Sequence, residues 1–160
     1  MRMTHLDEKG RAIMVDITEK YMTDRVATAS AKVRMQPETL QMIRANKAQK
    51  GDVLAVARVA GIMAAKKCAE LIPLCHPVPL TSAKIEFDFT EENTIKIVAE
   101  TKTSYATGIE MEALAAVSVA ALTIYDMCKA VDRAMVVDQI QLETKSGGRS
   151  GEFNREEQTI

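Results

Sequence analysis

The sequence predicts an α+β fold in which helices cover one face of an antiparallel sheet. Alternating and helical hydrophobic patterns follow one another as strand, helix pair, two strands, long helix and strand. That order resembles the split βαβ arrangement of ferredoxin-like folds. The 160 residues are about the size of one domain, and no repeat, low-complexity block or charge run divides them. We therefore expect a single domain over residues 1–160, with flexible ends at residues 1–12 and 154–160.

The first predicted elements are a strand and a helix pair. Residues 31–35 alternate weakly and are expected to form a strand. Pro37 can occupy the first turn of a helix over residues 37–46. Asp52 follows a glycine break and can N-cap a second helix, which carries an apolar stripe and is expected to end near Leu71.

A stiff loop and a hairpin follow. Three prolines lie within residues 71–79, so this segment cannot be helix interior and must be extended. Residues 82–89 and 94–100 alternate between apolar and polar positions, which predicts two half-buried strands. The short polar link at residues 91–93 predicts that the two strands form a hairpin.

The last two elements are a long helix and a final strand. Residues 108–130 are apolar on nearly every side and rich in alanine, which predicts a buried helix able to approach its neighbours closely. Thr107 and Glu110 have the spacing of a capping box, so Glu110 is expected to cap the start of this helix. Residues 135–142 are the final predicted strand. The small residues, and a helix that is apolar on nearly every side, would also suit an oligomer that buries more of this surface.

Composition and charge exclude several classes of protein. The net charge of -1 gives no global attraction to nucleic acid or anionic membranes, and 3 Phe, 3 Tyr and no Trp argue against base stacking. Three cysteines without Cys-x-x-Cys spacing argue against a disulfide framework or a zinc ribbon and fit a reduced, cytoplasmic protein. We find neither the apolar core of a signal peptide nor a run of about 18 apolar residues, so no membrane contact is expected.

Two loop segments carry candidate binding residues. His76 lies in the stiff loop, where it could bind substrate, move a proton, or make one structural hydrogen bond. A metal site is not expected there, because Cys75 and His76 are adjacent and no ligand follows three or four residues later. The glycine-rich run at residues 145–151 can present N–H groups and two positive charges to phosphate, or can be a disordered tail.

The long helix carries ionisable residues near both of its ends. Glu112 falls in the first turns, where a carboxylate among apolar residues needs solvent, a cation or a function. Asp126 and Lys129 share a face at i,i+3 spacing, as a solvated salt bridge or as an acid/base pair. Glu112 and Asp126 are separated by roughly 21 Å of helix. If both ends serve one site, two subunits must therefore supply them.

Seven sequence blocks, taken together and in order, resemble the MoaC family over about residues 14–153. Arg149 stands where that family often carries lysine. The blocks are Met14-Val-Asp-Ile17, Lys50-Gly-Asp-Val53, Ala57-Arg-Val-Ala-Gly-Ile62, Leu71-Ile-Pro-Leu-Cys-His-Pro77, Thr107-Gly-Ile-Glu-Met-Glu-Ala-Leu114, Ala121-Leu-Thr-Ile-Tyr-Asp-Met-Cys-Lys-Ala130 and Lys145-Ser-Gly-Gly-Arg-Ser-Gly151.

The resemblance implies a lyase of molybdenum cofactor biosynthesis. Such an enzyme converts 3′,8-cyclo-7,8-dihydroguanosine 5′-triphosphate to cyclic pyranopterin monophosphate and releases pyrophosphate. The resemblance implies no cofactor, although Mg²⁺ commonly accompanies a triphosphate. It also implies a homo-hexamer, a trimer of dimers with active sites at the dimer interface. The alternative is a noncatalytic nucleotide-binding regulatory domain, because such folds host many functions.

The resemblance also implies roles for individual residues. Asp126 and Lys129 match an acid/base pair, and Lys50 matches a lysine that acts on the purine-derived ring. Lys145 and Arg25 are expected phosphate contacts. If two subunits share one active site, one possibility is that Lys50 and Asp126 reach it from different chains. The other implied substrate contacts are Leu74, Cys75, His76, Glu110, Met111 and Glu112.

Overall fold

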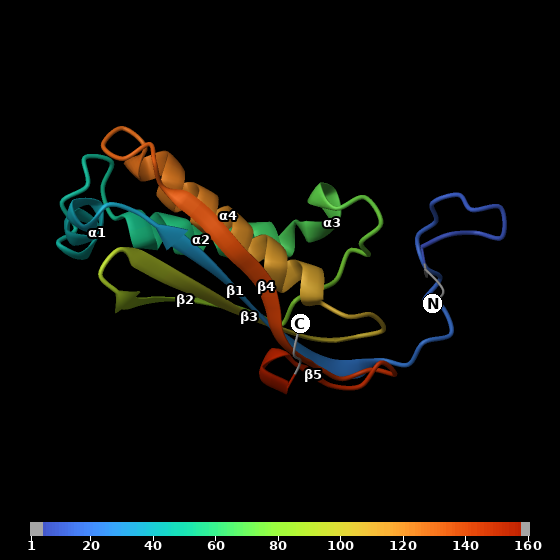
Figure 1. Cartoon of the computed structure of the whole chain (residues 1–160). Coiled ribbons are helices and arrows are strands. Elements are labelled where there is room, and N and C mark those ends of the chain that lie inside the picture. Colours follow the sequence, from blue (N-terminus) through green and yellow to red (C-terminus); the bar gives the residue numbers. More distant parts are fainter. Residues whose placement is uncertain (1–4, 158–160) are drawn as a thin grey trace.

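The computed structural model describes residues 5–157, which form a five-stranded antiparallel sheet with the helices on one face (Figure 1). Of the ends expected to be flexible, residues 1–4 and 158–160 lie outside the described residues. The elements in chain order are β1 (Thr23–Arg34), α1 (Pro37–Arg44), α2 (Val53–Lys66), α3 (Cys68–Leu71), β2 (Ser82–Glu91), β3 (Thr94–Tyr105), α4 (Glu110–Cys128), β4 (Val136–Ser146), β5 (Phe153–Asn154) and the 3-10 helix η1 (Arg155–Glu157).

The strand order confirms the predicted fold class. The sheet runs β2-β3-β1-β4-β5, and its neighbouring strands are antiparallel. Its first four strands have the order of a split βαβ fold, in which β1 and β3 are central. The predicted strands at residues 82–89, 94–100 and 135–142 are all present, and each extends further toward its C-terminal end. The short strand β5 was not predicted.

The central strand β1 begins eight residues before the predicted strand. Its positions facing the helices are Ala27, Ala29, Ala31 and Val33, all of them buried. Alanine is neither β-branched nor strongly hydrophobic, so this alternation gives only a weak strand signal. The strand is stabilised by pairing along its whole length with β3, from Thr23 to Arg34.

Small residues let the two long helices approach each other and the sheet, as predicted. A Cβ atom on Gly61 of α2 would lie 2.3 Å from Ile85 Cδ1 on β2 and 2.8 Å from Ala116 O on α4. By length and composition alone, α4 could cross a membrane, which the sequence reading did not anticipate. Its packing against α2, β1 and β3 explains why a core helix has this apolar sequence.

The helix starts agree with two predictions and contradict a third. Pro37 opens α1, and the Asp52 carboxylate accepts a hydrogen bond from Ala55 N at 2.9 Å. The predicted capping box is wrong, because Ile109 is the N-cap of α4 and Glu110 is its first helical residue. The Glu110 carboxylate instead pairs with Lys145 at 3.0 Å, a charged partner that competes with the backbone cap.

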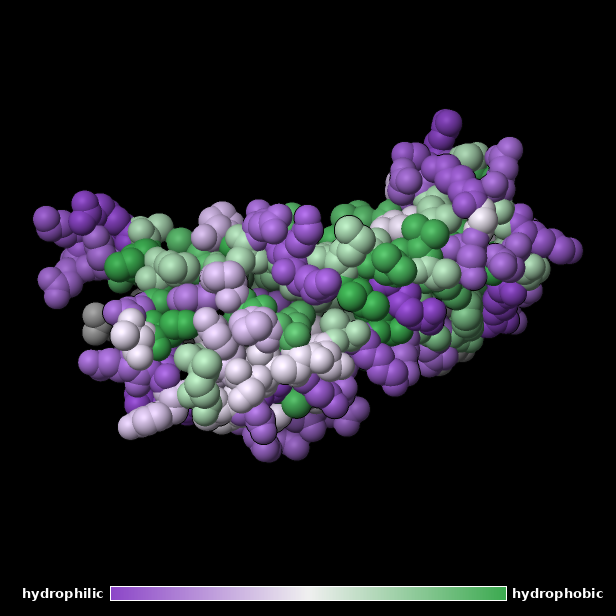
Figure 2. Space-filling model, turned by 180° about the vertical axis from the view of Figure 1, so that it is seen from behind, coloured by the Kyte–Doolittle hydropathy of each residue, from purple (hydrophilic) through white to green (hydrophobic). Residues whose placement is uncertain are grey.

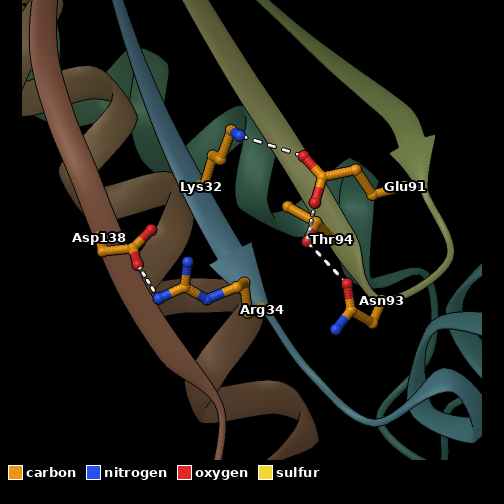
Figure 3. A network of polar contacts seen from close by, with 6 residues as sticks. All are labelled: Lys32, Arg34, Glu91, Asn93, Thr94 and Asp138. Carbon is orange, nitrogen blue, oxygen red and sulfur yellow. Dashed lines mark hydrogen bonds and ion pairs between the residues drawn. The ribbon is translucent and has the colours of Figure 1, made fainter.

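The sheet face away from the helices is polar. At the predicted hairpin, Lys32 Nζ lies 3.1 Å from Glu91 Oε1, and Thr94 donates to Glu91 Oε2 at 3.1 Å (Figure 3). On the other side of β1, Arg34 pairs with Asp138 of β4. The first pair reaches across β3 and links β1 to the end of β2, whereas the second links β1 to its neighbour β4. Exposed pairs of this kind each contribute about 0–1 kcal/mol, so they mark the solvent side rather than the core.

Candidate active site

A cavity of about 570 Å³, here called the main pocket, opens beside the start of α4. The start of β1, the loop after α3, the start of α4 and the turn between β4 and β5 all lie at this end of the molecule (Figure 1). Lys145 does not line the main pocket but forms an ion pair with Glu110, which does. The other predicted substrate contacts all line the pocket: Arg25, Leu74, Cys75, His76, Glu110, Met111 and Glu112.

His76 makes a structural hydrogen bond, one of the roles considered from the sequence, and it also lines the main pocket. Its ring lines the main pocket, and its Nε2 lies 2.7 Å from Val15 O. A carbonyl oxygen only accepts, so Nε2–H must donate this bond, and in the neutral ring Nδ1 is the nitrogen left to accept. The bond also ties the segment before β1 to the loop after α3.

Arg25 is held against the glycine-rich loop. Its Nε donates to Tyr105 O at 2.9 Å, which fixes the guanidinium beside Gly148. A Cβ atom on Gly148 would lie 2.2 Å from the Arg25 guanidinium, and one on Gly147 would lie 2.1 Å from Asp24 O. Both glycines also have a positive φ. This part of the run is therefore a loop packed on β1, and glycine is required there.

Glu112 is the one strongly perturbed carboxyl among the predicted site residues. Its side chain faces the main pocket although the residue is only 3% exposed. Burial, aided by the charge of Glu110, raises the pKa of Glu112 to about 7. Burial and the nearby Glu112 also raise the pKa of Cys75, and they raise that of Cys68 to about 12. Glu112 can thus hold or release a proton near neutral pH, whereas both thiols stay protonated.

The second group of predicted residues, here called the lysine cluster, is Lys50, Asp126 and Lys129 at the far end of α4. Lys129 donates to Asp126 Oδ1 at 2.6 Å, and Lys50 Nζ lies 3.6 Å from Asp126 Oδ2 and donates to Asp126 O at 3.0 Å. The Lys129 hydrogen bond lowers the pKa of Asp126 and raises that of Lys129. Both partners are therefore charged at neutral pH.

The expectation that Lys50 and Asp126 come from different chains is wrong. The loop before α2 carries Lys50 to the end of α4, and the two residues meet within one chain. The distance argument holds instead for the lysine cluster and the main pocket, at opposite ends of α4. Glu112 and Asp126 are separated by roughly 21 Å of helix, which one small substrate does not span.

Comparison with known protein families matches residues 14–148 to the MoaC family. The chain belongs to the MoaC family.

Three curated relatives of the family are similar along almost the whole chain, and each is named cyclic pyranopterin monophosphate synthase. The protein of Thermomicrobium roseum is 60% identical over 156 residues, which are 97% of this chain and 94% of the relative. That of Desulfitobacterium hafniense is 58% identical over 157 residues, covering 98% and 96%. That of Brevibacillus brevis is 56% identical over 156 residues, covering 98% of both chains.

Sequence reasoning missed several lining residues of the main pocket in this MoaC-family chain. Lys20 and Tyr21 lie in a segment without hydrophobic periodicity, and His5 was placed in a frayed end, so no local signal marked them. Arg149 was not assigned a site role by itself, although it is one of the two positive charges of the glycine-rich run that were considered for phosphate. Within residues 5–157, no three His, Cys, Asp or Glu side chains are grouped so as to hold a metal ion.

Proposed function

We propose that the chain is a lyase that converts 3′,8-cyclo-7,8-dihydroguanosine 5′-triphosphate to cyclic pyranopterin monophosphate and pyrophosphate. One observation carries the proposal: relatives at 56–60% identity, matched over nearly their full length, bear the name of this synthase. The main pocket and the lysine cluster support it, because the pocket can bind an anionic nucleotide and the lysine cluster can move protons. Mg²⁺ would enter only with the triphosphate.

The lysine cluster is suited to general acid/base chemistry. At neutral pH Lys129 is protonated and Asp126 is ionised, so the ammonium group has a proton to donate and the carboxylate can accept one. Lys50 adds a second ammonium group directed at the same carboxylate. Ring opening and reclosure of a purine-derived substrate require such alternating proton transfers.

The active site combines the main pocket of one subunit with the lysine cluster of another. The length of α4 supports this arrangement, because one small substrate does not span the distance between the two sites in one chain. An apolar band runs along one face of the molecule, with hydrophilic residues at both ends (Figure 2). Val56, Val59 and Met63 on α2 and Leu122 on α4 are exposed and would be buried by assembly. The proposed assembly is a hexamer built from three dimers, located in the cytoplasm, where free thiols such as its three persist.

The deciding experiment is anaerobic incubation of the purified protein with the cyclised GTP derivative. Pyrophosphate release and the oxidised pterin product are followed together. We expect both products from the wild-type protein, and neither from Asp126→Asn or Lys129→Ala variants that keep the wild-type circular dichroism spectrum. Tight binding without either product would refute the lyase and favour a noncatalytic nucleotide-binding domain.

A further inference from the structure

We infer that Asp132 is a positioning residue for the lysine cluster. It lies in the turn after α4, three residues beyond Lys129, and it does not line the main pocket. Its carboxylate binds the start of α1, which lies at the same end of the molecule as the end of α4 (Figure 1). Asp132 thereby joins the two parts of the chain that bring Lys129 and Lys50 to Asp126. Its effect on turnover rests on the proposed function, whereas its effect on the geometry of the cluster does not.

Asp132 is buried and fully engaged in hydrogen bonds. It is 4% exposed, and within residues 5–157 the only other buried carboxyl group is that of Glu112. Its Oδ2 accepts from Gln36 N at 2.7 Å and from Thr39 Oγ1 at 3.2 Å. Its Oδ1 accepts from Ala134 N at 3.1 Å. A buried carboxyl group costs free energy unless its oxygens are hydrogen-bonded, so these three bonds fix both segments that the side chain joins.

The start of α1 depends on this distant carboxylate. Gln36, the N-cap of α1, makes no side-chain capping bond, and Thr39 occupies the third helical position. In a capping box a glutamate at that position would reach back to the N-cap N–H. Here Asp132 accepts from the Gln36 N–H and from the Thr39 hydroxyl instead. A carboxylate at a helix N-terminus is favourable, so Asp132 fixes where α1 begins.

The position of α1 in turn determines the position of Lys50. The connection from α1 to α2 is short and tightly folded, since Gly51 N donates to Ala48 O at 3.0 Å and Ala48 is buried. Lys50 lies within this connection, and its Nζ donates to Asp126 O at 3.0 Å. A shift of α1 therefore moves Lys50 relative to Asp126.

The turn that carries Asp132 also carries Lys129. Val131 N and Asp132 N both donate to Cys128 O, at 3.0 and 3.1 Å, which closes a tight turn at the end of α4. Lys129 is the C-cap of α4 and lies inside this turn. Loss of the bonds from Asp132 to α1 would therefore displace both ammonium groups of the cluster, each from a different side of Asp126.

Such a displacement affects proton transfer more than substrate binding. Proton transfer requires groups within hydrogen-bond distance, and a misplacement of about 1 Å can cost about 100-fold in rate. The main pocket lies at the other end of α4, roughly 21 Å away along the helix, so its shape does not depend on Asp132. Substitution of Asp132 should therefore lower kcat and leave KM nearly unchanged.

The test compares variants that remove the hydrogen bonds without changing the shape of the side chains. Asp132→Asn turns one acceptor oxygen into a donor, whereas Thr39→Val removes one donor and Thr39→Ser keeps it. In the turnover assay we expect kcat to fall about tenfold or more in Asp132→Asn and less in Thr39→Val, with KM within about twofold of wild type and Thr39→Ser close to wild type. In crystal structures of Asp132→Asn and Thr39→Val, Lys50 Nζ should lie beyond hydrogen-bond distance of Asp126 O.

The matched control is Ser30→Ala. Ser30 is 3% exposed and donates to Glu143 on the sheet face away from the helices, so this variant also loses a buried hydrogen bond, but away from both sites. It should unfold more easily than the wild type and keep the wild-type kcat per folded chain, with the folded fraction taken from circular dichroism.

Wild-type kcat in both Asp132→Asn and Thr39→Val would overturn the positioning role, and so would an unmoved lysine cluster in their crystal structures. If Asp132→Asn does not fold, Thr39→Val and Thr39→Ser decide. The two proposals fail separately. Turnover by the wild type with unchanged kcat in the variants rejects the positioning role alone. No turnover by the wild type rejects the lyase, and the crystal structures then decide whether Asp132 positions the cluster.

Discussion

Glu112→Gln should stabilise the protein at pH 8 and leave its stability unchanged at pH 4. Burial raises the pKa of Glu112 from its ordinary value of 4.5 to about 7 in the folded chain. Below pH 4.5 both the folded and the unfolded chain are protonated there, so the carboxyl costs nothing. Between these two values the unfolded chain releases its proton while the folded chain retains it, so the free energy of unfolding falls as pH rises. Above about pH 7 the free energy of unfolding falls no further from this group, because the carboxyl is ionised in both the folded and the unfolded chain.

The magnitude follows from the width of that window. About 2.5 pH units at about 1.4 kcal/mol each give a gain of about 3.5 kcal/mol for Glu112→Gln at pH 8. Urea unfolding at pH 4, 6 and 8, at one fixed protein concentration, measures it. Glu92→Gln is the matched control, because Glu92 is exposed in the β2–β3 turn and should give no change with pH. A Glu112→Gln effect of equal size at all three pH values would refute the reasoning.

Three further predictions concern the assembly and the helices. When the His76→Ala and Lys129→Ala proteins are mixed and exchange subunits, activity should return in about a quarter of the sites. Half of the dimers then contain one subunit of each variant, and each such dimer restores one of its two sites. Lys50→Ala mixed with Asp126→Ala should regain none, and recovery there would contradict the assigned clusters. Gly61→Ala should lower the free energy of unfolding by about 1–3 kcal/mol in urea titrations, because its Cβ would overlap Ile85 and Ala116. Asp52→Ala should cost about 1 kcal/mol by the same measurement and Asp52→Asn much less; equal losses would argue against capping at α2.

Hydrophobic patterns were enough to predict the order of the elements but not their ends. Strands with large apolar residues were recognised, such as β2 with Ile85 and Phe87. The first eight residues of β1 were not, because the alternation there rests mainly on Ala27 and Ala29. Their burial depends on α4, which lies far along the chain. The capping box failed for the same reason, since Lys145 reaches Glu110 only in the folded sheet.

The candidate site could be predicted in part. Family resemblance supplied the residues that carry motifs, such as His76 and Asp126, and the structure sorts them into two clusters. The family resemblance could not supply Lys20, because nothing in the local sequence distinguishes that lysine from a solvated surface charge. Its place in the main pocket depends on the path of the segment before β1, which the bond from His76 to Val15 O helps to fix.

The packing of α2 against α4 connects stability to the proposed chemistry. Lys50 lies just before the N-cap of α2, whereas Asp126 lies near the end of α4. The relative position of the two helices therefore sets the distance of 3.6 Å between Lys50 Nζ and Asp126 Oδ2. At Gly61 the two helices lie close together, since a Cβ atom there would be 2.8 Å from Ala116 O of α4. A side chain at this position would push the helices apart and move Lys50 away from Asp126. The same small residues that make a dense core therefore also hold the lysine cluster in register, and the length of α4 keeps that cluster away from the main pocket of the same chain.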